Sequence, residues 1–233
     1  MSCEKMDKGL GEERIWRLIS SEAMAIIAIM RQNARFRVGS ARDEDDASEH
    51  SLIQGLQRVR RHHFVSRPPG RKAIEPFVEL ITSAETPAFI TGAALLAVGR
   101  LLREGAVVRA ADLGYVVEGV LACRFEQSDA ASDEKVIALM FRVLEAAVDS
   151  PLLARLWRRP QLPVRVVVEV VLSVRKAVKE GRFSPLLRDA AARTLCAISE
   201  RLCCILCTWE EDAEKEDEED EEEGGEGGGR GSL

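Results

Sequence analysis

The sequence predicts an all-α protein, a stacked array of about eight helices followed by a disordered acidic tail. Composition favours this class: 46% of the 233 residues are apolar but only 5% are aromatic, so Leu, Val, Ala and Ile must fill the core. The net charge of −6 is uneven, because residues 210–233 hold 13 acidic and 2 basic side chains (−11), which leaves residues 1–209 at +5. We therefore expect a flexible N-terminus over residues 1–11, a mildly basic helical domain over residues 12–209 and a disordered tail over residues 210–233.

Apolar residues recur at helical spacing along the domain and define the individual helices. Pro76 is expected in the first turn of its helix, and Ser132 is a natural N-cap for the clearest helix of the chain. Between residues 88 and 102 the only charge is Arg100, which predicts a central helix that is apolar nearly all round. The predicted helices cover residues 12–36, 50–59, 75–83, 87–102, 110–123, 132–147, 164–179 and 185–209.

Residues 164–174 are the one ambiguous stretch. Every second residue from Val164 to Val174 is apolar, as in a strand. The polar residues Arg165, Glu169 and Ser173, however, follow a helical spacing, and the polar periodicity continues to residue 179, which is too long for an ordinary strand. Because no partner strand is evident elsewhere in the chain, we predict a helix.

The residues that could catalyse a reaction or bind a metal form no recognisable site. His62 and His63 are adjacent, so on a helix they point about 100° apart and cannot chelate one ion as residues four apart do. Four cysteines lie along one predicted helix, and we interpret them as a small-residue packing stripe rather than a zinc site. They are Cys196, Cys203, Cys204 and Cys207. We expect no catalytic residue, no metal and no cofactor.

The sequence also shows no recognisable sorting signal. The chain has no run of 18 uncharged apolar residues, so no membrane span is expected. The N-terminal residues lack a basic start followed by an apolar stretch, which predicts no secretory signal. Six cysteines without such a signal fit a reducing compartment, so we expect a cytoplasmic protein.

Two basic clusters lie in acid-free stretches, residues 58–72 and residues 151–168. Such patches suit anionic lipid head groups, nucleic acid or the chain's own acidic tail, and ordinary solvated loops remain the alternative for each. Interleaved aromatic residues are nearly absent, so no nucleic acid is expected as a partner. The clusters consist of Arg58, Arg60, Arg61, Arg67, Arg71 and Lys72, and of Arg155, Arg158, Arg159 and Arg165.

Several segments resemble the N-terminal dimerisation and cyclophilin-binding domain of the large Arf guanine-nucleotide exchange factors. The most specific, from Cys123 to Leu144, is similar to the Arg-Phe…Thr-Asp-Pro-Ala-Ser-Asp-Glu segment of the Golgi brefeldin-resistance and GNOM subgroup, with Ala130 in place of the usual Pro. The others are Ile19-Ser-Ser-Glu…Met30-Arg-Gln-Asn-Ala-Arg-Phe36, Pro76-Phe-Val-Glu-Leu-Ile-Thr-Ser-Ala-Glu-Thr86 followed by Ile90-Thr-Gly-Ala-Ala-Leu95, and a weaker match at Leu186-Leu-Arg-Asp-Ala-Ala…Thr194-Leu.

The resemblance covers about residues 14–206 in order and implies an armadillo-like array with a regulatory role in Arf activation. It implies that the chain forms a homodimer, contacts the downstream homology region of an exchange factor, and has a cyclophilin as a further possible partner. It also implies a peripheral place on Golgi or endosomal membranes in vesicle transport. No segment resembles the catalytic Sec-seven domain, so we expect a fragment, a truncated gene product or a stand-alone regulatory module. The alternative is a helical module that binds membrane surfaces or nucleic acid through its basic patches.

Two charged residues are candidates for the dimer interface. In the resembling family a basic residue late in the central helix and the Glu of the Ser-Asp-Glu segment are associated with self-association, and Arg100 and Glu134 occupy the matching positions. The alternative is that Arg100 reaches solvent along its apolar stem and that Glu134 only complements the helix dipole.

Overall fold

The computed structural model describes residues 3–36, 49–61, 70–150, 152–153, 164–179 and 183–224. Within these residues the chain forms eight α-helices and one 3₁₀-helix and no β-strand, so the all-α prediction is confirmed. None of the described helices is both long enough and apolar enough to pass through a bilayer. The elements are α1 (Cys3–Gln32), η1 (Ala34–Phe36), α2 (Ser51–Arg61), α3 (Arg71–Thr82), α4 (Ala88–Arg103), α5 (Ala110–Leu121), α6 (Ala130–Val148), α8 (Val164–Lys179) and α9 (Pro185–Gly224).

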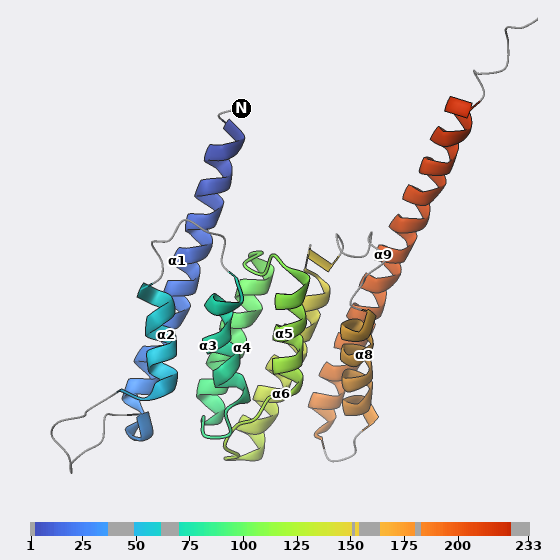
Figure 1. Ribbon diagram of the computed structural model, residues 1–233. Helices are drawn as coiled ribbons and strands as arrows, with labels where there is room; N and C mark the ends of the chain where they lie inside the picture. Colours follow the sequence, from blue (N-terminus) through green and yellow to red (C-terminus); the bar gives the residue numbers. More distant parts are fainter. Residues whose placement is uncertain are drawn as a thin grey trace, which may run out of the picture.

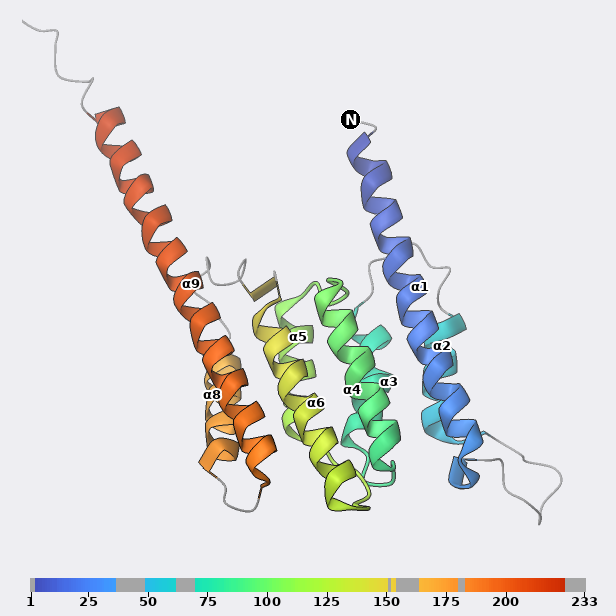
Figure 2. The same cartoon turned by 180° about the vertical axis from the view of Figure 1, so that it is seen from behind.

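The helices stand side by side in two rows. Helices α2, α3, α5 and α8 form the nearer row in Figure 1, and α1, α4, α6 and α9 form the nearer row when the molecule is seen from behind in Figure 2. Helices α1 and α2, α3 and α4, α5 and α6, and α8 and α9 pack as pairs, and α4 against α6 and α6 against α9 join consecutive pairs. The predicted stacked array is therefore confirmed.

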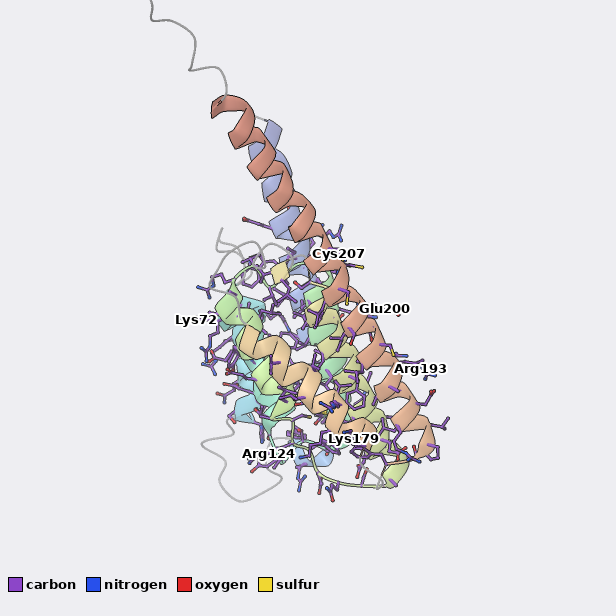
Figure 3. All side chains as sticks on the ribbon, turned by 90° about the vertical axis from the view of Figure 1, so that its right-hand side faces the viewer. Lys72, Arg124, Lys179, Arg193, Glu200 and Cys207 are labelled. Atoms are coloured by element: carbon purple, nitrogen blue, oxygen red, sulfur yellow. The ribbon has the colours of Figure 1, made fainter. Side chains whose placement is uncertain are left out.

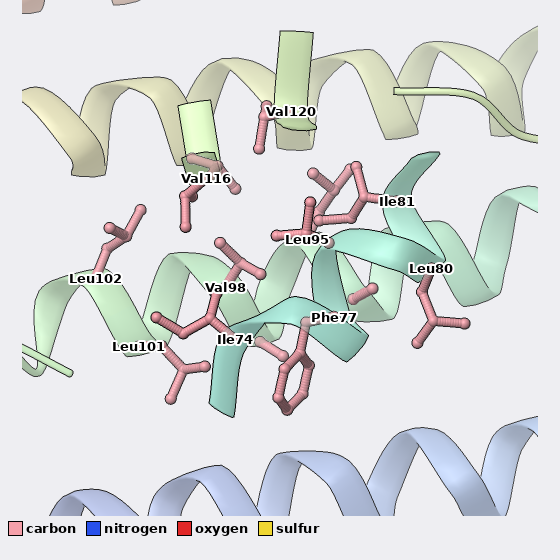
Figure 4. Close-up of a cluster of buried hydrophobic side chains, with 14 of the residues drawn as sticks. Ile74, Phe77, Leu80, Ile81, Leu95, Val98, Leu101, Leu102, Val116 and Val120 are labelled. Atoms are coloured by element: carbon pink, nitrogen blue, oxygen red, sulfur yellow. The ribbon is translucent and has the colours of Figure 1, made fainter. Parts of the chain in front are cut away.

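The centre of the array is an apolar cluster between α3, α4 and α5 (Figure 4). Helix α4 contacts α1, α3 and α6, and it is buried along most of its length, as its apolar sequence predicts. Each large side chain that is withdrawn from water here contributes about 1.5–3 kcal/mol, which is what holds the two rows together. The cluster includes Ile74, Phe77, Leu95, Val98, Val116 and Val120, which are each at most 1% exposed.

The C-terminal end of α4 needs a glycine. Gly105 has a φ of 72°, a left-handed conformation that other residues adopt only with strain. Its N–H donates to the Leu102 carbonyl at 3.2 Å, and the N–H of the buried Ala106 donates to the Leu101 carbonyl at 2.9 Å. These two bonds form a Schellman motif that satisfies the last carbonyls of α4 and turns the chain towards α5.

Two predicted details at helix starts are wrong. Helix α3 begins at Arg71, so Pro76 lies inside the helix rather than in its first turn. The helix starts earlier because Ala73 and Ile74 continue its buried apolar face, and this burial outweighs the hydrogen bond that proline removes. Helix α6 is capped by Asp129 instead of Ser132: the Asp129 carboxylate accepts the Ser132 N–H at 2.9 Å. Hydrogen bonds from Ser132 accordingly hold the pKa of Asp129 below its ordinary value.

The ambiguous stretch is helical, as predicted, and forms α8. The outer ends of the two terminal helices differ from the predicted boundaries. Helix α1 begins at Cys3, so residues 3–11, expected to be flexible, are helical, and α9 continues past residue 209 to Gly224. Both extensions continue a helix that already exists, so no new helical turn has to be nucleated, and the extension of α9 consists mostly of Glu. The disorder expected for the acidic tail stays a prediction.

Candidate functional site

Three of the family-like segments meet at one end of the array. A guanidinium nitrogen of Arg35, in η1, donates to the Glu85 carbonyl at 3.0 Å and pairs with the Glu126 carboxylate at 2.6 Å. The Glu126 N–H donates to the Thr86 carbonyl at 2.8 Å, and Pro87 and Glu126 form an isolated parallel bridge. These bonds join the end of α1 to the turn before α4 and the loop before α6, so the role of this junction is to align the helix pairs.

Two buried threonines complete this junction. The Thr86 hydroxyl contacts the Leu80 carbonyl at 3.0 Å, the Ser83 carbonyl at 2.8 Å and the Thr91 hydroxyl at 2.9 Å. Neither threonine is exposed, so their hydrogen bonds satisfy the carbonyls that the end of α3 leaves unpaired. Sequence reasoning missed this network, although a Thr directly before the Pro that opens α4 is a signal for a turn.

Arg100, the first candidate for the dimer interface, is committed to a contact within the chain. Its guanidinium donates to a Glu22 carboxylate oxygen at 2.8 Å, which links α4 to α1. The Arg100 side chain is 63% exposed and that of Glu22 is 13% exposed. The pair therefore lies at the edge of the α1–α4 contact, where the exposed side of Arg100 is still accessible to a second molecule.

Glu134, the second candidate, positions the start of α9. Its carboxylate accepts the Ser184 N–H at 2.8 Å and also accepts the Ser184 hydroxyl proton. Ser184 in turn caps α9, because its hydroxyl accepts the Leu187 N–H at 3.2 Å and its carbonyl accepts the Arg188 N–H at 3.0 Å. The Ser184 hydrogen bonds lower the pKa of Glu134 from its ordinary value.

The structure does not bring these two residues together. Arg100 is held against α1 and Glu134 against the beginning of α9, and α1 and α9 stand at opposite ends of the array (Figure 1). Whether either residue contacts a second copy stays a prediction, but each already has a contact within its own chain.

A groove of about 590 Å³ lies between α4 and α6 and has exposed apolar walls. Phe89 and Leu96 on α4 are 55% and 49% exposed, and Leu139 on α6 lines the other side. Gly92 lies at its floor, where an added methyl group would be 3.4 Å from Leu139. Exposed aromatic and aliphatic side chains around a hollow are typical of a surface that binds another protein.

The surface around the first predicted basic cluster carries less positive charge than the sequence of residues 58–72 alone indicates. Arg58, Arg60 and Arg61 are exposed on α2, and Arg71 and Lys72 are exposed at the start of α3; Arg67 lies outside the described residues. Helix α3, however, adds Glu75 and Glu79 to the same surface. Burial and the Glu75 charge raise the pKa of Glu79, and the Arg58 charge lowers it.

An aromatic ring also belongs to this surface, because the Arg71 guanidinium lies over the Tyr115 ring, 4.0 Å from its centre. The pKa of Tyr115 is raised by burial and by the Glu75 charge, against a lowering contribution from Arg71. Arg71 is thus partly engaged in a cation–π contact within the chain.

In the second cluster, Arg155, Arg158 and Arg159 and the Arg165 side chain lie outside the described residues. Further along α8 the structure reveals a basic and apolar face that sequence reasoning missed. It consists of Val168, Leu172, Arg175, Lys176 and Lys179, all exposed. The signal was present in the spacing of residues 168, 172, 175 and 179, which share one side of a helix.

The predicted cysteine packing stripe is wrong. Cys196, Cys203, Cys204 and Cys207 are all exposed, because α9 buries the opposite side, which includes Leu187, Ala191 and Ile198. Figure 3 shows Cys207 on the outer side of α9 in line with Arg193 and Glu200. Cys123 is partly buried, and this burial raises the pKa of its thiol to about 12, which disfavours the thiolate. Within the described ranges no three His, Cys, Asp or Glu side chains are grouped as a metal site would require.

Known proteins align with this chain along more than half of its length. "ARF guanine-nucleotide exchange factor GNL1" of Arabidopsis thaliana is 38% identical over 143 residues, and "ARF guanine-nucleotide exchange factor GNOM" of the same plant is 35% identical over 141 residues. This chain contains a region related to Arf exchange factors. A third relative, "ARF guanine-nucleotide exchange factor GNL2", is 26% identical over 144 residues.

The alignments cover 56–58% of this chain but about a tenth of the length of each curated Arf exchange factor. No family model matches the chain. The relationship is therefore established for one part of much longer proteins.

Proposed function

We propose that this chain is a non-catalytic regulatory and dimerisation region of an Arf exchange factor that acts in vesicle trafficking. The alignments with GNL1 and GNOM are the observation that carries this proposal. The all-α stacked array and the family-like segments that meet around Arg35 and Glu126 are consistent with it. In this proposal the exchange reaction belongs to a part of the relatives that does not align with this chain.

A nucleotide-release assay tests the non-catalytic part of the proposal. The full chain is added in excess to an Arf GTPase loaded with a fluorescent guanine nucleotide, and a catalytic exchange domain serves as the positive control. We expect the release rate to stay at its spontaneous value at every chain concentration. A rate that rises in proportion to the chain would show that the chain itself catalyses exchange.

A second copy of the chain is the first partner that we propose, and the α4–α6 groove is the surface that best supports it. Phe89 and Leu96 expose apolar area there, and Arg100 continues the same side of α4. An apolar contact bordered by a charge is the usual composition of a protein interface. We also propose contacts with the downstream homology region of an exchange factor and with a cyclophilin, and a location at Golgi or endosomal membranes.

The substitution pair Phe89→Ser and Leu96→Ser tests this surface. Both side chains are about half exposed, so their loss should leave the fold intact but should weaken self-association about tenfold or more, since each contributes on the order of 1 kcal/mol in an apolar contact. Leu186→Ser is the control, because Leu186 is 82% exposed on α9 and outside the groove. Light scattering after size exclusion measures the mass; equal self-association of all variants would contradict the assignment of this surface.

A further inference from the structure

Helix α8 exposes an unusual combination of side chains for a helix that packs on α5, α6 and α9. Val168 is 46% exposed and Leu172 is 54% exposed, although both are large apolar residues. Arg175 and Lys179 follow them on the same side of the helix, at spacings of three and four residues. Val174, on the opposite side, is fully buried. Among the described side chains, the outer face of α8 thus presents Val168 and Leu172 first and the basic residues after them.

Within the part of the chain that the structure describes, no acidic side chain neutralises these basic residues; Glu180, the residue after Lys179, lies outside that part. Leu172, Arg175, Lys176 and Lys179 line a hollow of about 350 Å³, and no acidic side chain among the described residues borders it. Along the whole of α8, Arg and Lys outnumber acidic residues by four to one, the acid being Glu169, whose side chain lies outside the described residues. The basic surface on α2 and α3 differs, because Glu79 lies within it.

The chain's own acidic segment is poorly placed to cover this face. Lys179 lies near the start of α9, whereas the acidic segment of residues 210–233 begins about 37 Å from that start, along a helix that rises 1.5 Å per residue. Figure 1 shows that α9 carries these residues away from the end of the array where α8 joins α9. Figure 3 looks onto this side, with α8 at the surface and Lys179 at its lower end.

We propose that the exposed face of α8 docks on a bilayer that contains anionic lipids. Leu172 and Val168 would enter the boundary between head groups and acyl chains, while Arg175, Lys176 and Lys179 reach the phosphates. A face that combines exposed aliphatic side chains with basic ones that have no described acidic neighbour matches the two components of such a surface, acyl chains and phosphates. This inference goes beyond the proposed regulatory role and gives the protein a membrane contact of its own.

Vesicle flotation with the full chain tests the proposal. The probes are vesicles of phosphatidylcholine alone and of phosphatidylcholine with about one third phosphatidylserine, at physiological ionic strength. Each basic residue near such a surface contributes about fivefold to the affinity, about 1 kcal/mol, so Arg175→Gln, Lys176→Gln and Lys179→Gln together should weaken binding to the anionic vesicles about 100-fold. Leu172→Ser alone should weaken it several-fold.

A matched control separates this face from a general charge effect. Arg58→Gln, Arg60→Gln and Arg61→Gln remove the same number of charges from α2, and this variant should lose less than about fivefold. Circular dichroism confirms that each variant is folded. Equal losses in the two triple variants, unchanged binding of Leu172→Ser, or equal binding to neutral vesicles would each overturn the proposal.

Discussion

Replacing Gly119 with Ala tests how closely α3 and α5 pack. A Cβ atom on Gly119 would lie 2.3 Å from the Cγ1 atom of Val78, whereas ordinary contacts are 3.4 Å or longer, so about 1.1 Å must be gained by movement. Val78 is only 3% exposed and β-branched, which leaves it little freedom to rotate away. Overpacking of this kind costs about 1–3 kcal/mol, and the gain in helix propensity from Gly to Ala returns about 1 kcal/mol. We expect a net loss of up to about 2 kcal/mol in the free energy of unfolding.

Urea unfolding followed by circular dichroism measures this loss and two controls. Gly11→Ala, on α1, should be neutral or stabilising by up to about 1 kcal/mol, because no atom lies within 4 Å of its new Cβ. In a Val78→Ala background the clash is removed, so Gly119→Ala should no longer destabilise. A stabilising Gly119→Ala, or a cost that persists unchanged in the Val78→Ala background, would refute the close approach of these helices.

Three further predictions follow from individual contacts. Glu134→Gln should remove part of the thermal stability that the protein loses on acidification. The lowered pKa of Glu134 gives stability that is present above its ordinary value of 4.5 and is lost as the pH falls through the folded-state pKa. A variant whose melting temperature depends on pH between pH 3 and pH 7 in the same way as that of the unmodified protein would contradict the Ser184 contact. Arg100→Ala should lower the free energy of unfolding by less than about 1 kcal/mol, since the side chain is mostly exposed. The same substitution should shift the chain towards monomer, and an unchanged dimerisation constant would show that Arg100 is not part of the dimer interface. Deleting residues 210–233 should increase binding to anionic vesicles at low salt, because the deletion removes a charge of −11 that the anionic lipids repel. Unchanged binding would count against this repulsion.

Local sequence patterns predict the helices well where one face is apolar and the other is not. The absence of charge around Arg100 predicts that α4 is central, and the length of the polar periodicity correctly assigns α8 to a helix rather than a strand. Helix starts are less certain, because two acceptable caps, Asp129 and Ser132, lie three residues apart and only the geometry of the loop selects between them. Pro76 shows the same limit, since burial of the preceding turn decides where α3 begins.

The surfaces depend on contacts between distant residues, which a single sequence does not reveal. Cysteines on α9 share one side with exposed charged residues, but a helical wheel with apolar residues on both sides does not tell which side is buried. An acid-free stretch such as residues 58–72 predicts a basic patch only if no other element contributes acid, and α3 contributes Glu79. The pairing of Arg100 with Glu22 links residues 78 positions apart.

Sedimentation equilibrium of the unmodified chain tests the proposed dimerisation region most directly. The protein is examined at several rotor speeds over a wide range of concentrations, at physiological salt and under reducing conditions, so that the exposed cysteines of α9 do not cross-link copies. The proposal predicts an average mass that rises from 25.7 kDa towards twice that value and fits a single monomer–dimer equilibrium. A mass that stays at 25.7 kDa at every concentration would contradict it.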